Sequence, residues 1–455
     1  MTTKAYLVFA VVLRTAFAVV LVNAPFWWME QSQFLNRGFF GLDSLIALSV
    51  MVVQPLIGRA VLVLAWIFDA VVAKSQTYHF QSPLDFIASA RFASTIDWVS
   101  FFEPDLISLI LPFVVAMVLL PLIIGNSRSV LPFLFAVLLG LAVLDALNGT
   151  SRLSTTDQRH LPSNIAGSPA LTLSLSLIDQ INASSLRQLP ESETAAALVN
   201  LPEWANEHPE GRVLLVVVES MGAPMEPMLQ AYLDSLMHSK SHQTQISKLP
   251  FRGSTTSAEL RILCGLLGHY SKLKASDGSR CLPAQLNRQG WSTIGMHGFS
   301  ASMFDRKVWW PLSGLQQLAF VDSPFLDEAG RCGTAFSGAC DSEVLDAAGR
   351  WLQEGESRFA YVLTLNTHLP IGTVTVPPDL QQICETNKVD IDACQLVSGI
   401  GKVLNAIIRV VEHSRKPTLA LVIGDHAPPF NSLQARLSFS QQVTPAYVLR
   451  PNYSD

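Results

Sequence analysis

The chain has 455 residues, of which 49% are hydrophobic and 15% are charged, and its formal net charge at pH 7 is -5. It contains no run of basic residues, so the composition gives a nucleic-acid partner no electrostatic support. Apolar residues concentrate in the first third, and the remainder is long enough for one large domain with its own core. We therefore predict a membrane domain over residues 1–150, a connector over residues 151–208 and an α/β domain over residues 209–455.

Five apolar stretches in the first part are long enough for membrane-spanning helices, since roughly 17 to 20 apolar residues cross a bilayer. They cover residues 5–23, 40–56, 57–73, 106–124 and 130–147. The break between the second and third stretches rests on Gln54, Pro55 and Arg59. The first stretch follows Lys4 and also has the character of a signal peptide, but no clear A-x-A site ends it and four more stretches follow. We predict five transmembrane helices.

The connector is rich in Ser, Thr, Asn and Pro between Gly149 and Gly211. One stretch within it has an amphipathic pattern and predicts a helix around residues 171–181. The chain shows no repeat at a fixed period and no low-complexity tract.

The cysteines indicate the side of the membrane on which the large domain lies, whereas the positive charges of the loops do not decide it. All six cysteines fall in the large domain: Cys264, Cys281, Cys332, Cys340, Cys384 and Cys394. An even set of this kind suits disulfides formed in an oxidising compartment, and sequential pairing is the simplest of the connectivities that six cysteines allow. An odd number of spans then carries the large domain out of the cytoplasm.

Two apolar runs of the large domain end in residues that can bind a metal ion. Residues 213–218 read VLLVVV and precede Glu219, while residues 419–423 precede Gly424, Asp425 and His426. Continuous apolar runs are typical of buried parallel strands, and ligands bind beyond the carboxyl ends of such strands. The pattern therefore predicts that Glu219, Asp425 and His426 lie on one rim and hold a divalent cation.

A Ser/Thr cluster at residues 254–257 precedes another apolar stretch. Thr256 and Glu259 have the spacing of a capping box, so we predict that a helix begins here. Its N-terminus favours a bound phosphate, and the hydroxyl just before the cap, that of Thr255, would face it. Taken alone, such a cluster is a helix cap far more often than a nucleophile. With the three metal ligands nearby, Thr255 becomes a candidate nucleophile and fourth ligand, because a threonine needs a base or a metal for activation.

These motifs resemble the alkaline phosphatase superfamily, and specifically the lipoteichoic acid synthase branch of membrane-anchored, sulfatase-like transferases. The matching elements are a strand that ends in Glu219-Ser220, a threonine four residues before Glu259, and a strand that ends in Gly424-Asp425-His426. The resemblance implies an α/β domain with a central mixed sheet behind a five-helix anchor. It also implies that Glu219, Thr255, Asp425 and His426 bind the metal and that Thr255 is the catalytic nucleophile.

The resemblance extends to residues that would contact the substrate. His297 precedes Arg306 by nine residues, and Asn366-Thr367-His368-Leu369-Pro370 resembles the Asn-His-x-Pro element of the family. His297, Arg306 and His368 would then stabilise the charge on a phosphoryl group, and Phe304 would bind the substrate. Any one of these histidines alone would more often be a satisfied polar residue at a strand end. Three positions that shape the headgroup pocket depart from the family pattern: Phe299, Phe304 and Asp305.

The implied function is metal-dependent transfer of a phospho-alcohol headgroup from a membrane phospholipid to a cell-surface or periplasmic glycan, through a phosphothreonine ester. Phosphoglycerol from phosphatidylglycerol is the favoured group, and Mn²⁺ is the favoured metal, with Zn²⁺ or Mg²⁺ as alternatives. The implied location is the bacterial inner membrane, as a multi-pass protein whose catalytic domain lies on the periplasmic or extracellular side.

Three other functions fit parts of the pattern. A phosphoethanolamine transferase, with phosphatidylethanolamine as donor and a glycan or lipid A as acceptor, shares the metal ligands and the disulfides. Such enzymes usually add a histidine after the Asp-His pair, and residues 427–443 contain none. A sulfatase needs a C/S-x-P-x-R motif, and residues 254–261 lack its proline, which leaves a phosphodiesterase as the hydrolytic alternative. A non-enzymatic membrane scaffold would not need the four metal-site residues together.

Overall fold

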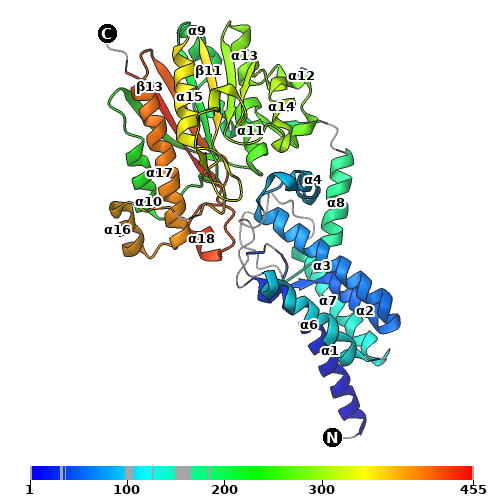
Figure 1. The fold of residues 1–455 in the computed structure, drawn as a ribbon. Helices are drawn as coiled ribbons and strands as arrows, with labels where there is room; N and C mark the ends of the chain where they lie inside the picture. The colour runs from blue at the N-terminus through cyan, green and yellow to red at the C-terminus, as the bar shows by residue number, and fades with distance from the viewer. Residues whose placement is uncertain are drawn as a thin grey trace. The chain divides into compact units, whose positions relative to one another are not determined.

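The computed structural model describes residues 3–30, 34–35, 37–97, 106–125, 128–148, 165–182, 185–372 and 374–452 (Figure 1). The chain divides into a helical unit, Met1–Ala88 with Phe102–Ser184, and an α/β unit, Ser89–Phe101 with Ser185–Asp455. These limits differ from the predicted ranges 1–150, 151–208 and 209–455. The predicted connector is divided between the two units. Its first helix packs in the helical unit, whereas Leu198, Leu201 and Trp204 belong to the core beneath the sheet.

The helical unit contains the apolar helices of the first third of the chain. Its helices are α1 (Thr3–Met29), α2 (Leu42–Val53), α3 (Pro55–Thr77), α4 (Pro83–Ser89), α6 (Leu106–Ile124), η2 (Arg128–Val130), α7 (Leu131–Asn148) and α8 (Pro169–Asn182). Two short strands, β1 (Phe40–Gly41) and β2 (Ala166–Gly167), pair in parallel. The α8 helix confirms the helix predicted around residues 171–181, and it packs on α3.

The count of five spans is not confirmed. Within the described residues, four helices are long and apolar enough to cross a membrane: Lys4–Met29, Pro55–Thr77, Arg128–Leu147 and Ile391–Glu412. The last is α17 of the α/β unit, which contributes to that unit's core. The apolar helix Leu109–Ile124, which is part of α6, is shorter than these four. The apolar helices of the helical unit nevertheless support a membrane protein.

The predicted second span is short because the chain turns back at once. The α2 helix has 12 residues and is about 18 Å long at about 1.5 Å per residue, less than the roughly 30 Å of a hydrocarbon core. Gln54 leaves helical geometry, with φ -138° and ψ 89°, and Pro55 begins α3. Gly58 allows the close approach, since a Cβ atom there would lie 2.2 Å from the Met51 Cα atom. The α2 and α3 helices therefore form a tight hairpin.

The α/β unit is built on a seven-stranded mixed sheet, which confirms the predicted α/β domain with a central mixed sheet. Its strands are β4 (Arg212–Val218), β5 (His242–Pro250), β7 (Ser292–His297), β8 (Gln317–Ala319), β11 (Arg358–Leu363), β12 (Thr418–Gly424) and β13 (Val443–Pro451). The order is β5-β13-β12-β4-β11-β7-β8. The five strands from β12 to β8 are parallel, β13 runs antiparallel to them, and the edge strand β5, which pairs antiparallel with β13, runs in the same direction as the five.

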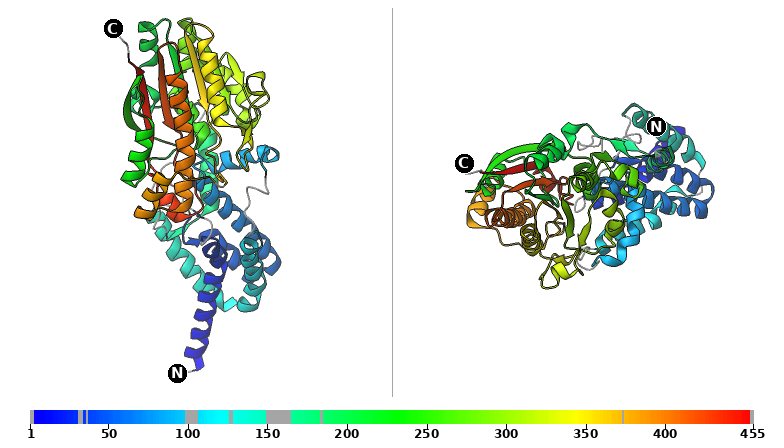
Figure 2. Two further views of the ribbon diagram at one scale, coloured as in Figure 1. Left: turned by 60° about the vertical axis from the view of Figure 1, so that its left-hand side comes forward. Right: turned by 90° about the horizontal axis from the view of Figure 1, so that it is seen from above.

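Helices cover both faces of this sheet, which explains the continuous apolar runs. Alternate residues of β4 enter two separate cores: Val216 faces one, and Leu215 and Val217 face the other. One core includes α10 (Pro227–Leu236), α15 (Asp341–Gln353) and α17 (Ile391–Glu412), and α15 and α17 lie side by side (Figure 1). The other includes α9 (Leu201–Glu207), α11 (Thr255–Cys264) and α13 (Leu282–Arg288). Figure 2 shows α17, in orange, lying along the sheet.

Shorter elements connect these layers. The remaining α-helices of the unit are α12 (Ala275–Gly278), α14 (Arg306–Trp309), α16 (Pro378–Asn387) and α18 (Leu433–Leu437). The short strands are β3 (Arg187–Gln188), β6 (Leu266–Leu267), β9 (Arg331–Cys332) and β10 (Gly338–Ala339). The 3-10 turns are η1 (Ala90–Thr95), η4 (Glu191–Glu193), η5 (Ala195–Ala197), η6 (Tyr270–Lys272), η7 (Met303–Asp305), η8 (Pro311–Ser313) and η9 (Pro324–Leu326).

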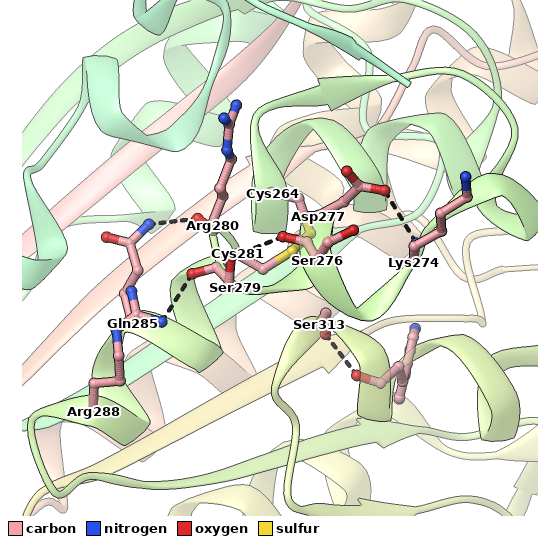
Figure 3. Close-up of a disulfide and its surroundings, with 11 residues drawn as sticks. Cys264, Lys274, Ser276, Asp277, Ser279, Arg280, Cys281, Gln285, Arg288 and Ser313 are labelled. Carbon is pink, nitrogen blue, oxygen red and sulfur yellow. Dashed lines mark hydrogen bonds between the residues drawn. A yellow bond between two sulfur atoms is a disulfide. The ribbon is translucent and has the colours of Figure 1, made fainter. Parts of the chain in front are cut away.

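All six cysteines form disulfides in the predicted sequential order. The pairs are Cys264–Cys281, Cys332–Cys340 and Cys384–Cys394. The first pair joins the last residue of α11 to the residue before α13, and Figure 3 shows it with the turn around Ser279 and Arg288. The Arg288 guanidinium donates to the Ser279 carbonyl at 2.9 Å across that turn. The disulfide thus fixes the far end of the helix that begins at Thr255.

Candidate metal centre and active site

The register of the sheet brings the predicted metal ligands together. The β4 and β12 strands are parallel neighbours with Val218 opposite Gly424, so Glu219 and Asp425 leave the sheet at the same edge. One ligand atom from each of Glu219, Asp425 and His426 lies within 4.8 Å of the others, and all three residues are buried. The neighbouring strand β11 supports this edge, since the Glu219 amide donates to the Thr364 hydroxyl at 2.9 Å.

Ser220 holds the two carboxylates in place. Its backbone amide donates to Asp425 Oδ1 at 2.8 Å, and its hydroxyl donates to Glu219 Oε1 at 3.0 Å. It does so from the left-handed region of backbone space, with φ of 55°, which is unfavourable for a residue other than glycine. Such strain persists only where the surroundings enforce it, and it clusters at functional sites.

The Glu219 and Asp425 carboxylates are buried side by side, and a bound cation would offset their mutual repulsion. Burial and the negative charge of Glu219 raise the pKa of Asp425 well above its ordinary value. Burial opposes ionisation of Glu219, but the pKa of that carboxyl is lowered overall, because the neighbouring histidines in their protonated forms and the hydrogen bonds from Ser220 and Thr255 favour the carboxylate. Asp425 Oδ1 accepts two backbone amides, whereas Asp425 Oδ2 is buried without a hydrogen bond. A buried, unsatisfied carboxylate oxygen beside a second carboxylate fits a divalent cation.

His426 is oriented as a metal ligand. Its Nδ1 lies 2.9 Å from the Ala427 carbonyl and donates to it, which leaves the Nε2 lone pair directed at the carboxylates. Burial lowers the pKa of His426 despite the opposing effect of Glu219, so the ring is held neutral, as metal binding requires. Nε2 lies 3.2 Å from Asp425 Oδ2 and 3.7 Å from Glu219 Oε1. A lone pair facing carboxylate oxygens is unfavourable unless a proton or a cation lies between them.

The Thr255 hydroxyl joins this group. Thr255 Oγ1 lies 3.1 Å from Glu219 Oε2 and 3.2 Å from His426 Nε2. Thr255 is the first residue of α11, so its side chain lies at the N-terminus of that helix, where the helix dipole is positive. Glu219, Thr255, Asp425 and His426, the four residues of the predicted metal shell, thus converge.

The predicted capping box is wrong. The α11 helix begins two residues earlier than expected, after Ser254, whose side chain makes no capping hydrogen bond. Thr256 is the second residue of the helix, and the Glu259 carboxylate does not return to the N-terminus. Glu259 instead pairs with Arg306, whose Nη2 donates to Glu259 Oε2 at 2.9 Å. A buried guanidinium is a stronger partner than a backbone amide, which explains the difference.

Arg306 therefore lies in the protein interior. Its guanidinium and the Glu259 carboxylate are both almost fully buried, and Glu259 also accepts from Trp310 Nε1 at 2.9 Å and Tyr361 Oη at 3.3 Å. The Arg306 Cζ atom lies 5.4 Å from the centre of the Phe304 ring. The two predicted substrate residues, Arg306 and Phe304, thus contact each other, and Arg306 is tied to the helix that carries Thr255.

The two other predicted substrate residues follow neighbouring strands. His297 ends β7, and its Nδ1 lies 3.0 Å from the Leu363 carbonyl; burial and then Arg306 lower its pKa well below the ordinary value. His368 follows β11, and its ring centre lies 3.9 Å from that of Phe336. The Thr367 hydroxyl donates to the Glu219 carbonyl at 2.5 Å, so the loop that carries His368 lies beside the candidate metal centre.

Two supporting residues were not predicted. Asp341 accepts the backbone amides of Leu365 and Asn366, each at 2.8 Å, and so holds the loop before His368; burial raises its pKa to about 7. Arg261 is fully buried and donates to the Asp425 carbonyl at 3.3 Å, and burial lowers its pKa to about 10. A charged residue inside the apolar part of a helix was the available signal for Arg261, since such a residue needs a buried partner.

Comparisons with known proteins match the part of the chain that carries the candidate site. The family model described as Sulfatase matches residues 212–449, just over half of the chain. The comparison with curated proteins found no match. The matched region begins at β4 and ends in β13, so it contains the sheet and every predicted site residue.

Several solved structures are similar at low identity. Lipoteichoic acid synthase LtaP from Listeria monocytogenes has 16% identity and a TM-score of 0.41, over 61% of this chain and 72% of that chain. Phosphoglycerol transferase GacH from Streptococcus pyogenes, in complex with sn-glycerol-1-phosphate, has 17% identity and a TM-score of 0.38, over 56% and 73%. The zinc complex of the periplasmic domain of EptC from Escherichia coli has 12% identity and a TM-score of 0.35, over 54% and 73%.

Proposed function

The chain belongs to the sulfatase family, and we propose that it is a membrane-anchored transferase that moves a phospho-alcohol headgroup from a phospholipid to a glycan. The observation that carries this proposal is the position of Thr255, whose hydroxyl oxygen lies 3.1 Å from Glu219 and 3.2 Å from His426 at a helix N-terminus. A hydroxyl in this setting suits nucleophilic attack on phosphorus.

Glu219, Asp425 and His426, with Thr255, would hold the metal. The unsatisfied Asp425 Oδ2 and the neutral His426 ring support this assignment. Mn²⁺ is our first choice, and one imidazole with oxygen ligands also suits Zn²⁺ or Mg²⁺. When bound, the cation would lower the pKa of the Thr255 hydroxyl and neutralise charge that develops on the phosphoryl oxygens.

The residues of the chain supply the rest of the reaction in two steps. Thr255 Oγ forms a bond to phosphorus as the bond from phosphorus to the diacylglycerol oxygen breaks, and diacylglycerol leaves with the proton. A glycan hydroxyl then forms its bond to phosphorus as the Thr255 ester breaks, and the proton returns to Thr255. The amides at the start of α11 would bind the phosphoryl oxygens, and Glu219 Oε2 accepts the hydrogen bond of the Thr255 hydroxyl before attack.

We propose phosphoglycerol as the transferred group and phosphatidylglycerol as the donor. The absence of a histidine from residues 427–443 favours this over phosphoethanolamine, which remains the second candidate. We also propose the bacterial inner membrane as the location, with the α/β unit on the periplasmic or extracellular side. The pairing of all six cysteines supports an oxidising compartment, and a membrane anchor suits a lipid donor because it raises the effective concentration of the lipid.

Turnover of labelled lipids tests this function. The full-length protein is reconstituted in liposomes that contain Mn²⁺, a membrane glycan fraction, and either phosphatidylglycerol or phosphatidylethanolamine labelled in the headgroup. We expect diacylglycerol to accumulate from phosphatidylglycerol and the label to enter the glycan. Label found only in free glycerol phosphate would make the protein a hydrolase, and consumption of phosphatidylethanolamine alone would favour the second candidate.

A further inference from the structure

One stretch of the α/β unit comes from the first third of the chain. Residues 89–97, which we call the clamp segment, follow α4 in sequence but belong to the α/β unit by their contacts. The Phe92 ring is buried against Phe304, with ring centres 5.4 Å apart. The Asp97 amide donates to the Ala335 carbonyl at 3.0 Å. The clamp segment is thus packed against the loop that leads into Arg306.

The clamp segment contacts a strained turn. Phe304 and Asp305 are consecutive residues with φ of 52°, in the left-handed region that only glycine adopts without cost. Such a turn needs its surroundings to hold it. Phe92 packs on the first strained residue, and the Arg91 guanidinium forms an ion pair with the carboxylate of the second. Arg91 also donates to the Tyr270 hydroxyl at 2.9 Å.

The strained turn leads directly to groups of the candidate active site. Arg306 follows it and pairs with Glu259, which lies on the same helix as Thr255. An aromatic cluster continues from Phe92 toward His368, where the Phe336 and His368 ring centres are 3.9 Å apart. The members of this cluster are Phe92, Phe299, Met303, Ala335, Phe336 and Leu365. The clamp segment therefore reaches Arg306 and His368 through continuous contacts.

We propose that the clamp segment fixes the Phe304–Asp305 turn and that Arg91 and Phe92 are positioning residues for Arg306 and for the aromatic cluster beside His368. The α/β unit is then complete only with the clamp segment, which lies in the sequence between α4 and α6. The structural part of this inference stands on the contacts alone, and its kinetic consequence rests on the proposed function.

The first test measures the turn itself in the full-length protein. Hydrogen–deuterium exchange is followed in peptides covering residues 299–307, where the Asp305 amide bonds to the Ser302 carbonyl and the Lys307 amide to the Ala301 carbonyl. We expect Arg91→Ala and Phe92→Ala to speed exchange there. Arg409→Ala is the matched control, because the Arg409–Asp346 pair is also exposed, at 47% and 39% compared with 52% and 36% for Arg91–Asp305. Unchanged exchange in both clamp variants, or equal acceleration in Arg409→Ala, would overturn the proposal.

The second test measures turnover per active site with labelled phosphatidylglycerol. Sites are counted from the burst of Thr255 ester, so that a loss of folded protein lowers the burst and leaves kcat per site unchanged. We expect Arg91→Ala to lower kcat per site by about ten- to hundred-fold, the range for displaced catalytic groups, with no such fall in Arg409→Ala. The double variant Arg91→Ala, Asp305→Asn should be no slower than Arg91→Ala, because both substitutions remove the same Arg91–Asp305 ion pair. A reduced burst with normal kcat per site, or additive losses, would refute the positioning role. A wild type that is inactive on both lipids would refute the proposed function, while the exchange result would still decide the clamp.

Discussion

The Thr255 hydroxyl lies 3.1 Å from the Glu219 carboxylate, although the two residues are 36 positions apart in the sequence. Glu219 directly follows the central strand β4, and Thr255 begins the helix α11 that packs beneath it. The same edge of the sheet supplies Asp425 and His426 from the parallel neighbour β12. The site therefore depends on the register between β4 and β12 and on the residue at which α11 begins.

Asp425→Asn should abolish metal binding with little effect on the fold. The amide oxygen keeps the bonds from Ser220 and His426, while the nitrogen replaces the unsatisfied Oδ2. Since loss of a group that only orients a metal ligand costs about 10- to 100-fold in affinity, we expect loss of the ligand itself to cost at least that much. Mn²⁺ titration followed by elemental analysis measures it. Unchanged stoichiometry and affinity in the variant would exclude Asp425 as a ligand.

Glu259→Gln should destabilise the α/β unit strongly. The change leaves the Arg306 guanidinium buried without its carboxylate, and breaking such a pair costs about 3 to 5 kcal/mol. Arg409→Ala removes an exposed pair and should cost less than about 1 kcal/mol. Denaturant unfolding in detergent compares the two variants. Equal losses would mean that the Glu259–Arg306 pair contributes no more than a surface pair.

Asp341→Asn should change how stability depends on pH. Burial raises the pKa of Asp341 from 3.8 to about 7, so the folded state holds a proton that the unfolded state loses between these values. This contribution to stability is fully present below pH 3.8 and is lost as pH rises toward 7. The variant lacks the titration and loses one acceptor for the Leu365 and Asn366 amides, at a cost of about 1 to 3 kcal/mol.

The deficit of Asp341→Asn relative to the wild type should therefore be largest in acid and should shrink as pH rises. The free energy of unfolding of both proteins, measured across this window, gives the deficit directly. A deficit that stays constant across the window would show that Asp341 does not titrate as its burial implies.

Replacing Cys264 and Cys281 together by serine should lower stability by about 3 kcal/mol, the value for a closed loop of about this length. Thermal unfolding of the full chain without reductant measures the loss. Alkylation of the denatured, unreduced wild type serves as the companion experiment and should label no cysteine. Labelling of any of the six would contradict the pairing and the proposed oxidising compartment.

Sequence reasoning was successful where the decisive interactions are local or repeat along a strand. Residues 213–218 read as a buried strand because alternate side chains enter two cores, and their register with β12 carried Glu219 and Asp425 to one edge. The sequential disulfides close short loops, and sequential pairing was predicted as the simplest of the possible connectivities.

The failures involve partners distant in the sequence. The spacing of Thr256 and Glu259 indicated a capping box, but Arg306, 47 positions away from Glu259, binds the carboxylate instead. The second span was predicted from apolar length alone, and the hairpin at Gln54 depends on close packing at Gly58 that length does not reveal. Arg91 lies 214 positions from Asp305, and no local pattern predicts that contact.

The most direct test of the proposed function is the covalent state of Thr255 when no glycan acceptor is present. Wild-type protein is incubated with phosphatidylglycerol and Mn²⁺, quenched in acid, and the peptide containing residues 254–257 is analysed by mass spectrometry. We predict a phosphoglycerol ester on Thr255 together with released diacylglycerol. Thr256→Ala should give the same adduct, and Thr255→Ala should give none, with turnover reduced by more than about three orders of magnitude. Release of diacylglycerol by Thr255→Ala at the wild-type rate, or an adduct on Thr256 instead, would contradict the account.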